Sequence, residues 1–335
     1  MQVILITVLV LLLLLFLGTY FLRRTPHGLL NTKVAIALKM VPERKKGISV
    51  AQQRAQMRKM VHQYKKEVPV LRIENRAIIT KEHSIPIRIY ADSRAENLPI
   101  LVYYHGGGWV VGDLETHDGI CRQLAKSANI LVVSVDYRLA PEYPFPVPLE
   151  DAYQSLIWLA ENGTTLGGNP QKIAVGGDSA GGNLAAAVAL KARDENGPTI
   201  AFQALIYPVT DLSKLTTPSY NYFANGYFLT REMMAQYIDY YTPDAAVRNH
   251  KYASPLLADN LQNLPPTLVI TAGFDPLRDE GEQFGERLKA AGIPTTITRY
   301  DGTIHGFFGL GALGKAGELA VKQVGMALQN AFSDN

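Results

Sequence analysis

Cysteine is nearly absent from this sequence, which has one such residue, Cys121, in 335. A single thiol cannot build an internal disulfide framework or a cysteine-based metal cluster. The chain also lacks internal repeats, and its one low-complexity stretch is an N-terminal leucine run. These absences exclude a disulfide-stapled scaffold and a repeat protein. With 47% hydrophobic residues the chain can bury a large core, so we expect one large α/β domain, alone or with a cap.

Charged side chains are missing from residues 1–22, MQVILITVLVLLLLLFLGTYFL. About twenty apolar residues are enough to cross the hydrocarbon core of a bilayer. A cleaved signal peptide normally begins with basic residues and ends in a small-x-small cleavage site, and this run has neither. We therefore predict an uncleaved, single-pass transmembrane anchor over residues 1–22, with a signal peptide and a buried core helix as the alternatives.

Acidic side chains are scarce in the segment that follows. Residues 23–66 contain twelve Lys or Arg and one acid, Glu43, whereas the rest of the chain has 21 bases and 29 acids. Because this basic segment adjoins the predicted anchor, an anionic membrane surface is a better partner for it than a nucleic acid. Bases gather on the cytoplasmic side of a span, so we expect a cytoplasmic catalytic domain, with export as the alternative. The oligomeric state stays open.

From residue 70 onward, strand-like and helical segments alternate. Continuous apolar runs are typical of strands covered on both faces, and their alternation with helices predicts a mostly parallel sheet between helical layers. The predicted strands are 72–79, 85–92, 98–105, 129–137, 172–177, 201–208, 266–275 and 295–301, and the predicted helices are 50–68, 116–127, 148–162, 180–195, 279–291 and 314–332. We expect basic juxtamembrane and cap helices over 23–70 and a catalytic domain over 71–335, with a cap insertion at 213–250.

The glycines of YYHGGGWVVGD, residues 103–113, do not form a phosphate site. A dinucleotide fingerprint needs glycine where Val111 stands, and a P-loop needs lysine after Gly112, where the chain has Asp113. Acids at 115 and 118 would also repel a phosphate. Such a loop can instead stabilise an anion that exists only during a reaction.

A nucleophile motif lies farther along the chain. Residues 177–181, Gly-Asp-Ser-Ala-Gly, form G-x-S-x-G between a predicted strand and a predicted helix, which is the context of a nucleophile elbow. The hydroxyl of Ser179 needs a base to become a good nucleophile. His305, in a loop after the last predicted strand, stands where the chain order of this fold places that base.

The catalytic acid should lie between the serine and the histidine, at the end of a strand. Asp275 meets this condition, since Pro276 ends the preceding apolar run. Asp279 and Glu280 are the nearest alternatives, although we expect them to begin the next helix and stabilise its N-terminus. Two weaker alternatives are Asp211 and Asp301.

The two glycine-containing motifs complement one another. Attack of Ser179 on a carbonyl creates an oxyanion, which elbow-type hydrolases bind with the N–H after the nucleophile and with a glycine loop after an earlier strand. Ala180 and residues 105–108 fit these two places. We therefore expect an oxyanion hole between them.

The sequence resembles the hormone-sensitive-lipase-like family of α/β-hydrolase esterases. The matching segments, in family order, are HGGGW (105–109), DYRLAPEYPFP (136–146), GDSAGG (177–182), DPLRDEG (275–281) and HGF (305–307). The resemblance implies an α/β-hydrolase fold with a helical cap, no metal and no organic cofactor. It also implies site residues: a triad of Ser179, Asp275 and His305, and oxyanion donors on Gly107, Gly108 and Ala180, with Gly106 shaping the turn.

Together these features predict a serine carboxylesterase that hydrolyses a small-molecule ester through an acyl-enzyme. A lipase, an amidase or a deacetylase could use the same machinery, and a non-catalytic ligand-binding protein of this fold is a further alternative. Trp109, Tyr222 and Tyr227 predict a compact aromatic pocket that prefers acyl chains of about two to eight carbons. The alternative for these aromatic residues is packing within the cap.

Overall fold

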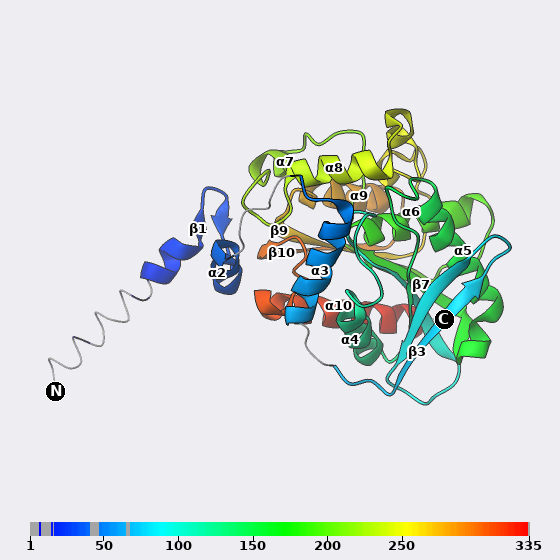
Figure 1. Cartoon of the computed structure of the whole chain (residues 1–335). Coiled ribbons are helices and arrows are strands. Elements are labelled where there is room, and N and C mark those ends of the chain that lie inside the picture. The colour runs from blue at the N-terminus through cyan, green and yellow to red at the C-terminus, as the bar shows by residue number, and fades with distance from the viewer. Residues whose placement is uncertain (1–6, 8–14, 16, 41–46, 65–67, 334–335) are drawn as a thin grey trace.

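The computed structural model describes residues 7, 15, 17–40, 47–64 and 68–333 (Figure 1). Within them, one eight-stranded sheet has the strand order β10-β9-β8-β7-β5-β6-β4-β3. Its strands are β3 (Arg72–Ile79), β4 (Ser84–Ala91), β5 (Leu98–Tyr104), β6 (Leu131–Val135), β7 (Gly168–Asp178), β8 (Phe202–Ile206), β9 (Thr267–Phe274) and β10 (Thr295–Ile304). The β3–β4 and β4–β6 pairs are antiparallel and the other pairs are parallel, which confirms a mostly parallel sheet.

Each central strand contributes side chains to two cores. In β5, Ile100 and Val102 join one buried cluster, whereas the intervening Leu101 and the following Tyr103 join the other. Because successive side chains of a strand point to opposite faces, a strand covered on both sides must be apolar throughout. This is the physical reason that continuous apolar runs marked the strands in the sequence.

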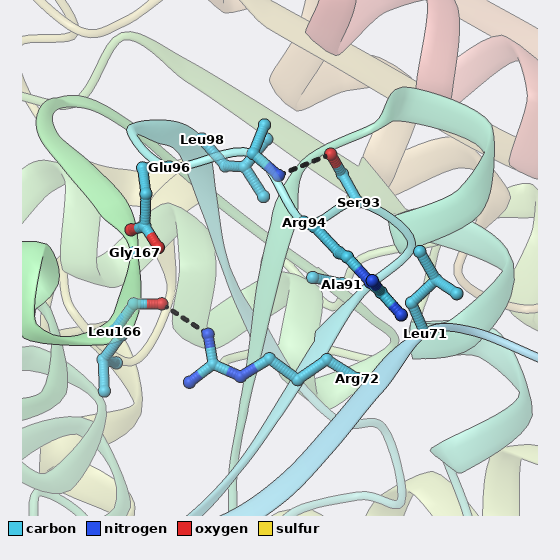
Figure 2. Close-up of a pocket in the computed structure, with 10 residues that line it drawn as sticks. Leu71, Arg72, Ala91, Ser93, Arg94, Glu96, Leu98, Leu166 and Gly167 are labelled. Carbon is cyan, nitrogen blue, oxygen red and sulfur yellow. Dashed lines mark hydrogen bonds between the residues drawn. The ribbon is translucent and has the colours of Figure 1, made fainter.

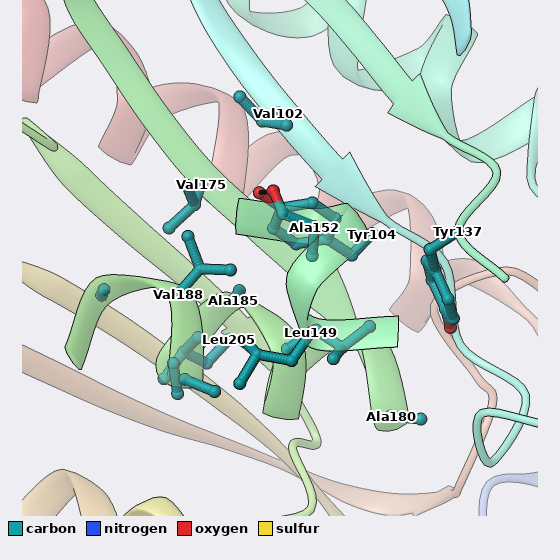
Figure 3. Packing of buried hydrophobic residues seen from close by; sticks show 14 of the residues in the cluster. Val102, Tyr104, Tyr137, Leu149, Ala152, Val175, Ala180, Ala185, Val188 and Leu205 are labelled. Carbon is teal, nitrogen blue, oxygen red and sulfur yellow. Dashed lines mark hydrogen bonds between the residues drawn. The ribbon is translucent and has the colours of Figure 1, made fainter. Parts of the chain in front are cut away.

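Helices cover both faces of the sheet. The first core holds residues of α5 (Val147–Asn162), α6 (Ala180–Asp194) and α9 (Arg278–Ala290), and the second holds residues of α4 (Asp118–Ala128) and α10 (Lys315–Ser333). Figure 3 shows part of the first core, where strand residues Val102 and Val175 gather with Ala152 of α5 and Val188 of α6. These five helices lie within two residues of their predicted bounds. Short 3-10 helices are η1 (Gly163–Leu166), η2 (Ala245–Asn249), η3 (Pro255–Leu257) and η4 (Gly311–Leu313).

The N-terminal segment forms a small unit beside β9 and β10 (Figure 1). Residues 17–23 are helical and lead into a hairpin of β1 (Arg24–Thr25) and β2 (Gly28–Leu29), which α2 (Thr32–Met40) follows. The sequence pattern did not predict the hairpin or α2. No helix in the described part of the chain is long and apolar enough to cross a membrane. The predicted anchor lies mostly outside the described residues, at 1–6, 8–14 and 16, so it stays a prediction.

Two segments far apart in the sequence meet the glycine loop. α3 (Val50–Tyr64) reaches it through Arg54, whose Nε donates to the carbonyl of Val110 at 2.9 Å. The region after β8 contributes α7 (Pro218–Tyr222) and α8 (Arg231–Tyr241), and the Tyr237 ring of α8 lies directly against Gly108. Figure 1 shows α3, α7 and α8 together on one side of the sheet.

Candidate active site

The G-x-S-x-G motif forms a sharp turn between β7 and α6. Ser179, the residue between them, has φ 57° and ψ −120°, a conformation that costs a non-glycine residue backbone strain. A β-carbon at Gly177 or at Gly181 would collide with the carbonyl oxygen of Tyr104 on the neighbouring strand. The two glycines therefore allow strand and helix to pack closely while the turn presents the serine.

Three side chains from three strand ends form a hydrogen-bonded chain. Ser179 follows β7, Asp275 follows β9 and His305 follows β10. The Nε2 of His305 lies 2.9 Å from the Oγ of Ser179, and its Nδ1 lies 2.7 Å from the Oδ2 of Asp275. All three residues are buried, and the second carboxylate oxygen of Asp275 accepts the N–H of Leu277 at 2.9 Å. The geometry is that of a nucleophile, a base and an orienting acid.

The alternative acids bind elsewhere. Asp279 accepts the N–H of Ser219 at 2.8 Å, and Glu280 accepts the N–H of Thr210 at 2.8 Å. Both acids lie in the first turn of α9, as expected. Glu280 departs from the expected role at the helix N-terminus, because burial, with the nearby charges of Asp211 and Asp275, raises its pKa well above the ordinary range. Its protonated form is therefore favoured over that of an exposed glutamate.

The glycine loop leaves backbone donors unused. Gly107 has φ 125° and Gly108 has φ 60°, values that L side chains rarely adopt. The carbonyl of Gly107 accepts the N–H groups of Val110 and Val111 at 3.1 and 3.0 Å, which closes the turn. The N–H groups of Gly107 and Gly108 have no protein acceptor within the ranges described above. Ala180, the first residue of α6, also has an N–H that the helix itself cannot satisfy.

A buried polar network lies behind this loop. The N–H of Gly106 lies 3.1 Å from the Oδ1 of Asp178 and 3.2 Å from the Nε2 of His117. Tyr103 donates its hydroxyl to the same Asp178 oxygen at 2.8 Å. Burial works to raise the pKa of Asp178, but the charge and hydrogen bond of His117, together with the Tyr103 hydroxyl, outweigh it and leave that pKa below its usual value.

The sequence pattern did not predict this network. One signal was available: Asp178 is a charged residue at the end of a buried strand, directly before the nucleophile. His105, the first residue of the HGGGW motif, stacks on Tyr137 with ring centroids 4.3 Å apart. Burial and the neighbouring His117 lower the pKa of His105 to about 4, so this imidazole is neutral near neutral pH.

The three predicted pocket aromatics lie in separate surroundings. Trp109 is fully buried and stacks on Tyr241, with ring centroids 4.3 Å apart. Tyr227 packs near Phe274, with ring centroids 5.4 Å apart. Tyr222 is half exposed and stacks on His27 of the N-terminal hairpin, with ring centroids 4.7 Å apart.

Two other aromatic residues, Tyr237 and Phe228, lie beside the glycines of the site. Tyr237 of α8 covers Gly108, as described above. The ring of Phe228 would lie 3.4 Å from a β-carbon at Gly306, the residue after His305. Helical or strand periodicity could not indicate either contact, because both join segments distant in sequence.

A pocket of about 310 Å³ lies away from these residues (Figure 2). Its lining includes Leu98, the first residue of β5, and Gly167, directly before β7. It also includes Arg72, which donates to the carbonyl of Leu166 at 2.7 Å. Ser179 follows the opposite, carboxyl end of β7, where ligands of open α/β sheets bind. The pocket in Figure 2 is therefore not the candidate active site. No described group of three or more His, Cys, Asp or Glu side chains could hold a metal ion.

Comparison with known proteins places the chain in a family. Residues 101–309 match the alpha/beta hydrolase fold family. Over 245 residues the chain is 42% identical to the carboxylesterase NlhH of Mycobacterium tuberculosis, covering 72% of this chain and 76% of that protein. It is 40% identical to an arylesterase of Saccharolobus solfataricus over 242 residues, which cover 72% of this chain and 78% of the arylesterase.

Solved structures agree with the sequence relatives. An esterase of Pyrobaculum calidifontis superposes with a TM-score of 0.85 at 41% identity, covering 90% of this chain and 98% of that one. A thermostable esterase of Pseudomonas putida superposes with a TM-score of 0.88 at 36% identity, covering 92% and 98%. The chain therefore belongs to the hormone-sensitive-lipase-like family of α/β-hydrolases, and the four relatives reported above are esterases.

Proposed function

We propose that this enzyme is a serine carboxylesterase in which Ser179 is the nucleophile, His305 the base and Asp275 the orienting acid. One observation carries the proposal: the His305 imidazole lies between the Ser179 hydroxyl at 2.9 Å and the Asp275 carboxylate at 2.7 Å. The presence of this histidine argues against a non-catalytic ligand-binding protein. Lipase, amidase or deacetylase activity would use the same three side chains.

The reaction proceeds through two proton-coupled steps. His305 takes the hydroxyl proton of Ser179 as Oγ attacks the ester carbonyl, and it then gives that proton to the departing alcohol. The acyl group stays on Ser179. A water molecule then gives a proton to His305 and attacks the acyl carbonyl, which releases the acid and returns the proton to Ser179. Asp275 holds the Nδ1–H tautomer and stabilises the imidazolium that forms in each step.

The oxyanion of each tetrahedral intermediate binds to the N–H groups of Gly107, Gly108 and Ala180. The two loop N–H groups have no protein acceptor among the residues described, and Ala180 adds the positive end of the α6 dipole. Preformed donors of this kind stabilise the transition state, because they need no reorientation as charge develops.

Short or medium acyl chains, of about two to eight carbons, are the proposed substrates, because a pocket lined by large side chains has little room for a long chain. The support is the crowding of the site by aromatic rings: Tyr237 covers Gly108 and Phe228 lies beside Gly306. Rates on aryl esters of increasing acyl length test the preference. Faster hydrolysis of emulsified long-chain triacylglycerols than of butyrate esters would reassign the enzyme as a lipase.

An N-terminal membrane anchor over residues 1–22, with the catalytic domain on the cytoplasmic side, is part of the proposal. It is supported by the uncharged run and by Arg23, Arg24, Lys33 and Lys39 on its C-terminal flank. Protease added to sealed cells should leave the domain intact. Digestion from the outside would reverse the orientation, and a product lacking residues 1–22 would remove the anchor.

The catalytic assignment is tested on the full chain purified in detergent. Wild-type protein should hydrolyse p-nitrophenyl butyrate and react with a fluorophosphonate at Ser179. Ser179→Ala should lose about six orders of magnitude in turnover, as in other triads. Ser127→Ala, in α4 on the other side of the sheet, is the matched control and should keep its activity. Fluorophosphonate labelling of a different serine would refute the assignment.

A further inference from the structure

The outer face of α2 is apolar where a surface helix is normally polar. Val34 and Ala35 point into the second core, whereas Ile36 and Met40, one turn apart, are 45% and 75% exposed. Lys33 shares the exposed face with Ile36 and Met40 at helical spacing. Apolar residues flanked by lysines are typical of helices that lie in a membrane interface.

The same surface continues onto α10. Lys33 lines a cavity of about 560 Å³ together with Lys315 and the half-exposed Leu319 of α10. Asp301 and Arg299 also line this cavity, but Arg299 pairs with Glu282, so the two lysines provide most of its positive charge. We call the surface made by Lys33, Ile36, Lys39, Met40 and Leu319 the basic apolar face.

The surrounding sequence indicates what covers this face. Residues 1–42 contain no Asp or Glu, and Glu43 is the first acid of the chain. The same stretch holds Arg23, Arg24, Lys33 and Lys39, and an uncharged apolar run precedes it. Basic residues beside apolar ones complement a surface of anionic headgroups over hydrocarbon. A protein partner that bound this face would not require the whole of residues 1–42 to lack acids, whereas an anionic membrane beside the segment would repel acids anywhere along it.

We propose that the basic apolar face docks on the surface of an anionic phospholipid bilayer, with Ile36 and Met40 between the headgroups and the lysines paired with phosphates. An anchor over residues 1–22 would only attach the chain to the membrane, whereas this docking would hold one face of the folded enzyme against the lipid. It does not depend on ester hydrolysis, nor on whether residues 1–22 cross the bilayer.

Docking here would bring the active-site loops close to the lipid. The N–H of Asn31 donates to the carbonyl of Gly302 at 2.8 Å, three residues before His305. Gly28 packs against the ring of Phe274, the residue before Asp275. The N-terminal unit therefore contacts both strand ends that carry the base and the acid, and apolar esters concentrate at the interface where it would lie.

The test places a fluorophore on the full chain in vesicles. Ile36→Cys and Met40→Cys are labelled with an environment-sensitive dye, with Ile79→Cys, 74% exposed on edge strand β3, as the matched control. Cys121 is fully buried and stays unlabelled in the folded protein. Vesicles of phosphatidylcholine, with or without phosphatidylglycerol, carry brominated acyl chains that quench a dye inside the bilayer.

We expect quenching at positions 36 and 40 in anionic vesicles and none at position 79. Lys33→Gln with Lys39→Gln should weaken docking about 30-fold, since each lysine near an anionic surface contributes roughly fivefold. Equal signals at positions 36, 40 and 79, or quenching independent of phosphatidylglycerol, would overturn the proposal. Hydrolysis of p-nitrophenyl butyrate by the same samples separates the two claims: quenching without hydrolysis refutes the esterase alone, and hydrolysis without quenching refutes the docking alone.

Discussion

The Oδ1 atom of Asp178 accepts the backbone N–H of Gly106 at 3.1 Å and lies 3.3 Å from the Nε2 of His117. Asp178 directly precedes the nucleophile, and Gly106 opens the loop whose next two N–H groups face no protein acceptor among the described residues. One carboxylate therefore joins the elbow to the loop that would bind the oxyanion. If the two parts shifted apart, nucleophile and donors would no longer converge on one carbonyl.

Asp178→Ala should lower kcat by about 10²–10³ with little change in KM, the loss expected when an oxyanion donor is misplaced. Asp178→Asn keeps an oxygen that can accept from Gly106 and should lose less. Kinetics on a short aryl ester, with a thermal melt to show that each variant folds, check this. Equal kcat values for the wild type and the alanine variant would contradict it.

The acid assignment is checked by a matched pair of variants. Asp275→Asn removes the carboxylate that contacts His305 and should cost about 10⁴ in kcat, by analogy with other triads. Asp279→Asn changes a carboxylate that binds Ser219 instead, and it should stay within about tenfold of wild type. A larger loss of kcat in Asp279→Asn than in Asp275→Asn would instead identify Asp279 as the catalytic acid.

Gly108→Ala should lower kcat strongly, because a β-carbon there would strike the Tyr237 ring and φ is 60°. The left-handed conformation alone costs an L residue about 1–2 kcal/mol. Adding Tyr237→Ala should restore part of the activity by removing the clash. Gly119→Ala is the control, since nothing lies within 4 Å of its β-carbon, and it should be active and slightly more stable. A fully active Gly108→Ala enzyme would refute the role of the loop.

Glu280→Gln should stabilise the protein progressively as pH rises above about 5. Burial raises the pKa of Glu280 in the folded state, whereas the unfolded chain ionises near the ordinary value. Between these two pKa values the unfolded state binds fewer protons, so the wild type loses stability with rising pH. Glutamine cannot ionise and escapes this loss.

Thermal melts of both proteins from about pH 4 to pH 9 should therefore diverge at the alkaline end and converge at the acid end. Glu282→Gln is the control, because its carboxylate pairs with Arg299 near the surface and its loss should lower the melting temperature without that divergence. A constant difference in melting temperature between Glu280→Gln and the wild type across the range would contradict a raised pKa for Glu280.

Local sequence patterns were sufficient to predict most of the strands and helices of the catalytic domain. Strands such as β5 and β9 are covered on both faces, so burial made them continuously apolar and visible without any knowledge of their partners. Ser179, Asp275 and His305 could be predicted as a group because each one follows a predicted strand. Parallel strands end at one edge of the sheet, so residues 126 and 30 positions apart in sequence meet there.

The tertiary structure decided what depends on contacts between distant segments. The strands of the N-terminal hairpin have two residues each, too few to show a period, and packing on β9 and β10 fixes their place. Tyr237 lies on Gly108 because α8 folds back over the loop, and no spacing along the chain encodes that approach.

Glu280 and Asp279, which are neighbours in the chain, also separate what the sequence determines from what the tertiary structure decides. Both begin α9, as their sequence position predicted, but Asp279 accepts a hydrogen bond from α7 while Glu280 is fully buried near Asp211 and Asp275. Sequence alone determined that two acids start a helix. Whether each acid is charged depends on the water and the charges around it, and only the folded arrangement of distant segments sets those.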